Sequence, residues 1–293
     1  RYGAQQRASL LESRKVELEY VMDEGGTIKT DGVSGISQPI ALIGIAEKGY
    51  TTIQLTSVGD GGHSSMPPPQ TSIGMLAEAI DKLQKQPFPA RLGGAAGYMQ
   101  DYLAPEMPFG TKLAMANRWL LKPVIINILS KTNAGNAMVR TSIAPTVIHA
   151  GVKDNVLPVE ALAKINFRIL PGDSVKGVAD YVKKVIDNER ITVETLTQFD
   201  SEPSPVSDTA AVGFRTLHRT IKSCFPNVIV APYLVVGATD ARYYKKVCKN
   251  LYRFMPVRMN EEDLKRPHGT NERISEDDFK NVVKFYVELV KGS

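Results

Sequence analysis

The pattern of apolar and polar positions predicts an α/β arrangement at both ends of the chain. A polar helical pattern ends near Arg14, and strands follow over 17–22 and 39–46. The second of these runs is continuously apolar, as expected of a strand buried on both faces. The same texture returns after residue 198, with helices at 212–221 and 279–289 and strands at 228–236 and 251–254.

The middle of the chain predicts a second kind of domain. Residues 51–58 alternate between apolar and polar side chains, as in a strand with one solvated face. The predicted order from there is strand, helix, strand, strand, helix, strand, with the remaining elements at 73–83, 146–152, 161–169, 175–186 and 191–196. This order is typical of a ferredoxin-like sheet of four antiparallel strands with two helices on one face.

These textures predict one domain inserted in another. We expect an α/β domain over 1–49 and 199–293 and an inserted α+β domain over 50–198. Residues 87–138 are irregular and rich in Pro and Gly, with a helical stretch near 119–129, and are interpreted as an insertion within the second domain.

Two of the predicted helices have N-cap candidates. Thr71 or Ser72 precedes a helix face of Ile73, Leu76, Ala77, Ile80 and Leu83. Ser275 precedes a terminal helix face of Phe279, Val282, Val283, Tyr286 and Leu289.

Composition narrows the function classes. Lys and Arg number 36 against 31 Asp and Glu, and they are scattered, so we expect no nucleic-acid partner. No run of about 18 apolar residues occurs, so we expect no membrane span. The two cysteines, Cys224 and Cys248, cannot form a disulfide framework or a cysteine zinc site.

Two loops carry candidate metal ligands. Asp23 ends a strand in the segment MDEGG, and ligands bind at the carboxyl ends of strands in open α/β sheets. His268 lies between Pro267 and Gly269, and a neutral imidazole suits zinc. The alternative for each is ordinary: a solvated turn for Asp23 and an exposed loop histidine for His268.

Three further residues are candidates for contacts with a substrate. His63, in a Gly-then-Pro loop, could donate a hydrogen bond to an oxyanion, or could belong to a surface tip. Arg242 follows the strand 228–236 and suits bidentate carboxylate binding, or an ion pair with Asp240. Asn155 offers donors and an acceptor, or serves only as a turn residue. His149 and His218 are interpreted as structural.

Taken together, these loops resemble the di-zinc aminoacylase and carboxypeptidase family of metallopeptidases, and within it the carboxypeptidase S or Gly-X carboxypeptidase type. The similar segments occur in the same order along essentially the whole chain; they are VMDEGG, IAEKG, GHSSMPPPQTSIG, NVLP, GATDARYY and RPHGTNERIS. Each segment alone is weak evidence for the family, whereas the six segments in this order are specific to it.

The resemblance implies a role for each candidate. Asp23 is similar to the ligand of one zinc and His268 to the ligand of the other. His63 is similar to a lid-domain histidine that contacts the scissile carbonyl, from the neighbouring subunit in dimeric relatives. Asn155 and Arg242 are similar to groups that bind the substrate's carboxylate or carbonyl. Residues 1–49 and 199–293 then correspond to a catalytic domain whose N-terminal part is missing. The 50–198 domain corresponds to a lid or dimerisation domain, which implies a homodimer.

The resemblance also implies a chemistry. Two zinc ions activate a water that attacks the amide of a small peptide or an N-acyl amino acid. Relatives of this type are often secreted or vacuolar, and the compartment is left open here.

The chain departs from the family pattern before Asp23. The family's His-x-Asp motif, bridging Asp and Glu-Glu pair have no counterpart among the first 22 residues, and no histidine precedes His63. We therefore expect an N-terminally truncated hydrolase without zinc-dependent amidase activity of its own. The alternative is a non-catalytic homologue that serves as a dimerisation or binding module.

Overall fold

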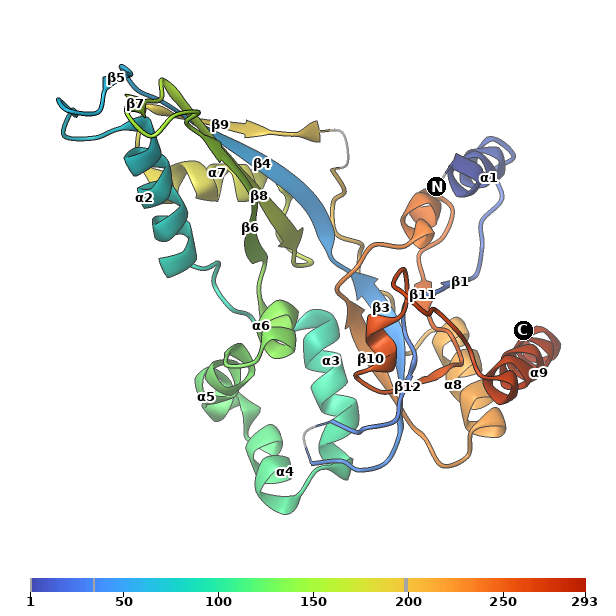
Figure 1. Cartoon of the computed structure of the whole chain (residues 1–293). Coiled ribbons are helices and arrows are strands. Elements are labelled where there is room, and N and C mark those ends of the chain that lie inside the picture. Colours follow the sequence, from blue (N-terminus) through green and yellow to red (C-terminus); the bar gives the residue numbers. More distant parts are fainter. Residues whose placement is uncertain (1, 34, 198–199) are drawn as a thin grey trace. The chain divides into compact units, whose positions relative to one another are not determined.

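The computed structural model describes residues 2–33, 35–197 and 200–293. The chain forms two compact units, shown in Figure 1. Unit 1 comprises Arg1–Glu47, Leu92–Leu129 and Ser204–Ser293, and unit 2 comprises Lys48–Arg91 and Ser130–Pro203. Mixed helices and sheets in both units confirm the predicted α/β class. The assignment of a catalytic role to one unit and a lid role to the other stays a prediction.

Unit 1 is built on a six-stranded mixed sheet. Its strands are β1 (Val21–Asp23), β2 (Ile28–Lys29), β3 (Ile40–Glu47), β10 (Ile229–Val235), β11 (Leu251–Arg253) and β12 (Arg258–Met259). The path runs β1-β11-β3-β2-β12, and β10 pairs with β3 in parallel. All eight residues of β3 are buried, as its unbroken apolar run predicts.

Helices of unit 1 pack on this sheet and on one another. They are α1 (Tyr2–Ser13), α3 (Gly94–Leu103), α4 (Phe109–Ala116), α5 (Arg118–Ser130), α8 (Val212–Cys224) and α9 (Glu276–Gly292), with short 3-10 helices η1 (Ala104–Glu106), η3 (Asp240–Lys246) and η4 (Asp263–Lys265). Helix α3 contacts β10, α8 contacts α9, and α1 contacts η3. No helix among the described residues is long and apolar enough to cross a bilayer.

Unit 2 has the predicted strand and helix order. Its strands are β4 (Gly49–Val58), β6 (Ser142–Ala150), β8 (Glu160–Ile169) and β9 (Ile191–Thr195), and its main helices are α2 (Ser72–Lys85) and α7 (Val175–Ile186). The sheet runs β6-β8-β4-β9 with every pair antiparallel, which is the ferredoxin-like order. Alternate residues of β4 and β8 form one core with apolar residues of α2 and α7.

The segment interpreted as an insertion folds differently from the expectation. It contains four helices, α3, α4, α5 and α6 (Asn133–Val139), where the sequence indicated one helical stretch. Residues 92–129 belong to unit 1 rather than to the 50–198 domain, because the buried side of α3 packs on β10. Only the ends of 87–138 stay with unit 2.

Several predicted boundaries and one predicted face also differ. Strand β1 begins at Val21 instead of residue 17, since Leu18 makes only an isolated bridge to Cys248. Strand β6 begins at Ser142 and ends before Gly151, whose positive φ bends the chain away. Helix α9 buries Phe285 and Leu289, four residues apart, whereas Phe279, Val283 and Tyr286 are exposed.

The cap predictions can be decided at the level of single hydrogen bonds. Thr71 caps α2, because its hydroxyl accepts from the backbone N–H of Gly74 at 3.1 Å. Ser72 is therefore the first residue of the helix, and its hydroxyl donates to the carbonyl of Pro158. Ser275 caps α9 by accepting from the N–H of Asp278 at 3.0 Å.

Candidate functional site

Asp23 is held by the segment that carries Arg242. It lies at the carboxyl end of β1, and its Oδ2 accepts a 2.6 Å hydrogen bond from the backbone N–H of Ala241, at the start of η3. Its Oδ1 accepts from the N–H of Glu24 at 3.0 Å. The structure thus brings together two of the predicted loops, MDEGG and GATDAR, through a backbone contact that fixes the carboxylate's orientation.

The two acids of this loop differ in their proton affinity. Burial raises the pKa of Asp23, but hydrogen bonds from Glu24, the Ala241 N–H and Thr239 outweigh it and hold that pKa below its ordinary value. The hydrogen bond to Asp23, together with burial, raises the pKa of Glu24 to about 7. The neighbouring carboxyls therefore favour one charge over two. Glu24 was not among the predicted site residues. Only its position next to Asp23 in the sequence could have indicated it.

A buried ion pair stabilises the backbone segment that binds Asp23. Glu47 ends β3, and its Oε2 lies 3.4 Å from Nε of Arg253 on β11, with both side chains almost fully buried. The same Oε2 accepts hydrogen bonds from the backbone N–H of Thr239 at 2.9 Å and from its hydroxyl at 2.8 Å. Thr239 is the residue before η3, so Glu47 anchors the helix whose Ala241 N–H holds Asp23. Sequence reasoning missed this network because charged residues indicate exposure.

Arg242 has donors left for a ligand. Its guanidinium lies over the ring of Tyr243, 5.0 Å from the centroid, and one Nη donates to the Tyr243 hydroxyl at 3.2 Å. A guanidinium has five N–H donors, so this contact orients the group without exhausting it. It is therefore set up for the bidentate carboxylate contact that the sequence suggested, a role that stays a prediction.

Gly26 of the MDEGG loop is required by close packing. A Cβ there would lie 1.9 Å from the carbonyl oxygen of Leu42 and 2.7 Å from that of Arg253. Because both neighbours are backbone atoms, they cannot swing away. We expect Gly26→Ala to lower the free energy of unfolding by about 2 kcal/mol in urea titration. Gly237→Ala is the control, since nothing lies within 4 Å of its Cβ position. Equal effects of the two changes would contradict this packing argument.

Unit 2 brings His63 and Asn155 together. The short strands β5 (Gly62–His63) and β7 (Val156–Leu157) pair, and the N–H of Ser64 donates to the carbonyl of Asn155 at 3.1 Å. Nδ1 of His63 accepts from the N–H of Ser65 and lies 2.8 Å from its hydroxyl, which leaves Nε2 free to face a ligand. Oδ1 of Asn155 is buried and has no hydrogen-bond partner among the described residues. A buried acceptor without a partner fits a residue that accepts a hydrogen bond from a ligand.

His268 lies in a loop of its own, and among the described residues its side chain forms no hydrogen bond or ion pair with Asp23. It lies on the exposed loop after η4 with φ of 61°, and its backbone N–H is 3.4 Å from a carboxylate oxygen of Glu272. Within the part of the chain that the structure describes, no three His, Cys, Asp or Glu side chains converge as metal ligands. The predicted ligands Asp23 and His268 alone do not form a metal site, because a catalytic zinc needs at least three protein ligands.

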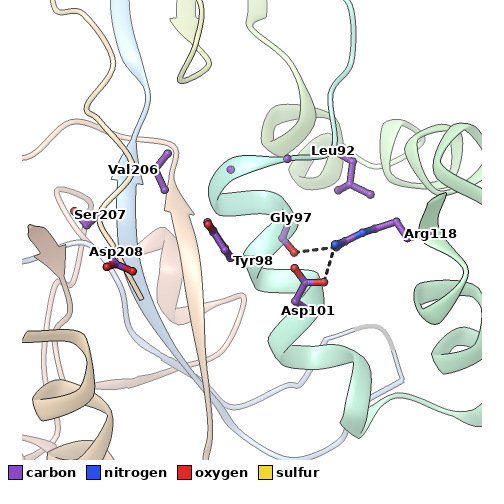
Figure 2. A pocket seen from close by; sticks show the side chains of 10 residues that line it. Leu92, Gly97, Tyr98, Asp101, Arg118, Val206, Ser207 and Asp208 are labelled. Atoms are coloured by element: carbon purple, nitrogen blue, oxygen red, sulfur yellow. Dashed lines mark hydrogen bonds and ion pairs between the residues drawn. The ribbon is translucent and has the colours of Figure 1, made fainter. Parts of the chain in front are cut away.

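A pocket of about 450 Å³ opens elsewhere in unit 1, beside the first turns of α3. Figure 2 shows Tyr98 on α3 facing the segment with Val206, Ser207 and Asp208. On the far side of α3, Arg118 is bound to Asp101 and to the carbonyl of Gly97 (Figure 2). None of the predicted site residues lines this pocket.

Comparison with known proteins decides the family. The peptidase dimerisation domain of the M20 peptidases matches residues 45–193. The chain belongs to the M20 peptidase family. The match covers the end of β3, all of the ferredoxin-like sheet of unit 2 except the last residues of β9, and also residues 92–129 of unit 1.

Curated M20 relatives match nearly all of the chain. The human N-fatty-acyl-amino acid synthase/hydrolase PM20D1 is 40% identical over 293 residues, which cover 99% of this chain and 58% of that protein. A probable carboxypeptidase S-like 2 of Dictyostelium discoideum is 39% identical over 276 residues, or 94% of this chain and 53% of that protein. The chain thus spans little more than half the length of these relatives.

A solved M20 structure shares the fold. The M20 metallo-carboxypeptidase Sso-CP2 of Sulfolobus solfataricus superimposes with a TM-score of 0.62 at 18% identity, over 97% of this chain and 66% of that one. M20 membership implies a metal cofactor, generally zinc. The described residues do not by themselves complete the ligand set of such a site.

Proposed function

We propose that this chain is part of an M20 hydrolase that releases an amino acid from N-acyl amino acids or small peptides by cleaving their amide bond. The observation that carries the proposal is the 40% identity, over 99% of the chain, to a relative named N-fatty-acyl-amino acid synthase/hydrolase. A second relative, named probable carboxypeptidase S-like 2, supports the proposal, because a carboxypeptidase releases a terminal amino acid.

The predicted site residues have the chemistry that such a substrate needs. Arg242 would bind the free carboxylate of the amino acid, since a guanidinium matches a carboxylate bidentately. His63 Nε2 and the Asn155 side chain would contact the scissile carbonyl, where negative charge develops during attack. Asp23, with its oriented carboxylate, would be one of the ligands of a zinc ion. His268 would be a ligand of the other zinc ion, and these two residues alone complete neither site.

The test of this function uses the protein encoded by the whole reading frame that contains this chain. Release of the free amino acid is measured from an N-oleoyl amino acid and from a dipeptide, with and without a zinc chelator. Metal-dependent release supports the proposal. A well-folded, zinc-loaded protein that releases neither product would support the alternative, a non-catalytic dimerisation or binding module.

Arg242→Met is expected to raise KM more than it lowers kcat. The reason is that a carboxylate remote from the reacting bond is held equally in the ground and transition states. One charge-assisted contact is worth about 1.5–3 kcal/mol, which corresponds to a rise of roughly 10- to 150-fold in KM. Arg215→Met, on the exposed side of α8, is the matched control. An unchanged KM for Arg242→Met would remove this residue from the binding site.

We propose in addition that the protein is a homodimer through unit 2, because the peptidase dimerisation domain of the M20 family matches residues 45–193, which include most of this unit. Strand β6 supports the proposal, since in the described part of the chain it pairs only with β8, at the edge of the sheet, and it is largely exposed. An unpaired edge is ready to extend a sheet across two copies. Light scattering at several concentrations measures the molar mass, and a monomer at all of them would contradict the proposal.

A further inference from the structure

Helices α4 and α5 present apolar side chains to solvent. Phe109 and Leu113, four residues apart on α4, are 80% and 53% exposed. On α5, Leu120, Val124 and Ile128 also recur every four residues and are 53–62% exposed, so they form one stripe. Trp119 beside them is 81% exposed. No residue of α4 is buried, and Ile125 alone is buried on α5. We name the six exposed residues the hairpin surface.

The charge around the hairpin surface has one sign. No Asp or Glu occurs between Glu106 and Asp154, whereas the two helices carry Lys112, Arg118 and Lys122. Arg118 is bound to Asp101, but within the described part of the chain Lys112 and Lys122 have no acidic partner. Apolar side chains next to unpaired lysines are the composition of helices that lie in an anionic membrane interface.

The surface is held in place by the rest of unit 1. The guanidinium of Arg118 ties the start of α5 to α3, through Asp101 at 2.8 Å and the carbonyl of Gly97 at 3.2 Å (Figure 2). The joint between the helices is fixed by Asn117, whose side-chain amide donates to Leu113 and whose carbonyl accepts from Leu120 and Leu121. Figure 1 shows α4 and α5 following α3 as consecutive helices. The apolar side chains therefore stay outward instead of folding onto a core.

We propose that the hairpin surface binds an anionic lipid bilayer, lying in its interface with the apolar side chains inserted and Lys112 and Lys122 at the headgroups. The charge decides against a second copy as the occupant. A symmetric dimer on this face would bring the unpaired lysines of both copies together, and like charges in one interface repel. A bilayer carrying phosphatidylserine supplies both the apolar layer and the opposite charge.

Trp119 allows a direct test because it is the chain's only tryptophan. The 293-residue chain and the whole reading frame are each mixed with vesicles of phosphatidylcholine, with or without 30% phosphatidylserine. We expect co-sedimentation with the anionic vesicles, a blue shift of the tryptophan emission, and quenching by brominated lipid. A bound protein whose tryptophan emission does not change would overturn the proposal. So would a whole-frame protein whose tryptophan is already shielded and unquenched, because another segment would then cover this surface.

Variants separate the two contributions. Lys112→Ala with Lys122→Ala should weaken binding to anionic vesicles about 10- to 30-fold, since each lysine near the surface counts for about fivefold. Leu120→Glu with Val124→Glu should weaken it at least as much while retaining the circular dichroism of the native chain. Val290→Glu is the control, as Val290 is 75% exposed on α9 and should bind as the native chain does. If the double Glu variant binds vesicles normally but changes the molar mass in solution, the surface is a protein interface and the proposal fails.

Discussion

Replacing Arg253 with methionine will lower the free energy of unfolding by about 3–5 kcal/mol, the range measured when one partner of a buried ion pair is removed. The side chain of Arg253 is fully buried and that of Glu47 is 3% exposed. Without the guanidinium, the Glu47 carboxylate would be left buried with hydrogen bonds only from Thr239. The carbonyl of Leu251, which accepts from Arg253 Nη1 at 2.8 Å, would lose that donor as well.

The control for this change is the same substitution at an ion pair whose arginine is partly exposed and whose carboxylate, on Asp278, keeps the hydrogen bond from the Ser275 hydroxyl. Arg258 lies 2.8 Å from Asp278, but its side chain is 46% exposed, so Arg258→Met should cost no more than about 1 kcal/mol. Urea titration of both variants gives the comparison. If the two losses are equal, the burial of the Glu47–Arg253 pair has no special energetic weight.

A second substitution shows whether the buried charge is the cause. Adding Glu47→Gln to Arg253→Met removes the uncompensated carboxylate while keeping its shape, so the double variant should be more stable than Arg253→Met alone. Simple addition of the two single losses would contradict this. In the whole protein, the same single variant should also disturb Asp23, because Glu47 anchors Thr239 and the N–H of Ala241 that holds Asp23.

Sequence periodicity was sufficient to predict the four-stranded sheet of unit 2 and the two helices that pack on it. The alternation along 51–58 and 161–169 becomes the two central strands, whose inward residues face α2 and α7. In a half-buried strand, the face on which a side chain lies is set by its place in the alternation. The sequence alone therefore contains the information on which residues are buried. The caps at Thr71 and Ser275 could be predicted for the same reason, since a cap contacts the helix it begins.

What could not be predicted depends on long-range packing. Residues 92–129 look irregular in sequence because Gly94 and Gly97 lower helix propensity, yet α3 forms where it can pack on β10. Helix α9 has apolar residues on more than one side, and contact with α8 and with the ring of Phe254 selects Phe285 and Leu289 as its buried face. Periodicity alone gives no basis for that choice.

The candidate site was also predictable only where it depends on local sequence. The positions of Asp23 and Arg242 could be predicted because Asp23 ends the strand β1 and Arg242 comes soon after the strand β10, whereas their roles stay predictions. Glu47 and Arg253 could not, since a charged residue at a strand end predicts exposure unless its partner is known, and the partner lies 206 positions away. The roles proposed for His63, Asn155 and His268 rest on the family resemblance, and their distances to Asp23 depend on the whole assembly.

Lys48→Met will remove a pH dependence from the stability of the chain. Lys48 is 1% exposed, and its Nζ donates to the carbonyls of Ala137 at 2.8 Å and Arg140 at 2.9 Å, at the end of α6. Burial, with a contribution from the nearby charge of Arg168, lowers the pKa of Lys48 to about 8 from its ordinary 10.5. The folded chain therefore binds this proton less tightly than the unfolded chain.

The sign of the effect follows from proton linkage. Between pH 8 and 10.5 the unfolded state carries more protons at this position, so the free energy of unfolding rises with pH across that window. A difference of this size corresponds to about 3 kcal/mol over the full window. Methionine cannot titrate, so the native chain should gain this amount over Lys48→Met between pH 7.5 and 10.5, in addition to a constant loss from the two unpaired carbonyls.

Urea titrations of both proteins at intervals across this range measure the gain. Comparing the two at each pH cancels the titration of the cysteines and tyrosines, which both proteins share. Lys85→Met is the matched control, because Lys85 is 75% exposed in an ion pair with Asp81 and should give a difference that does not vary with pH. A constant difference for Lys48→Met would mean that Lys48 keeps an ordinary proton affinity in the fold. The bonds to Ala137 and Arg140 would then compensate fully for its burial.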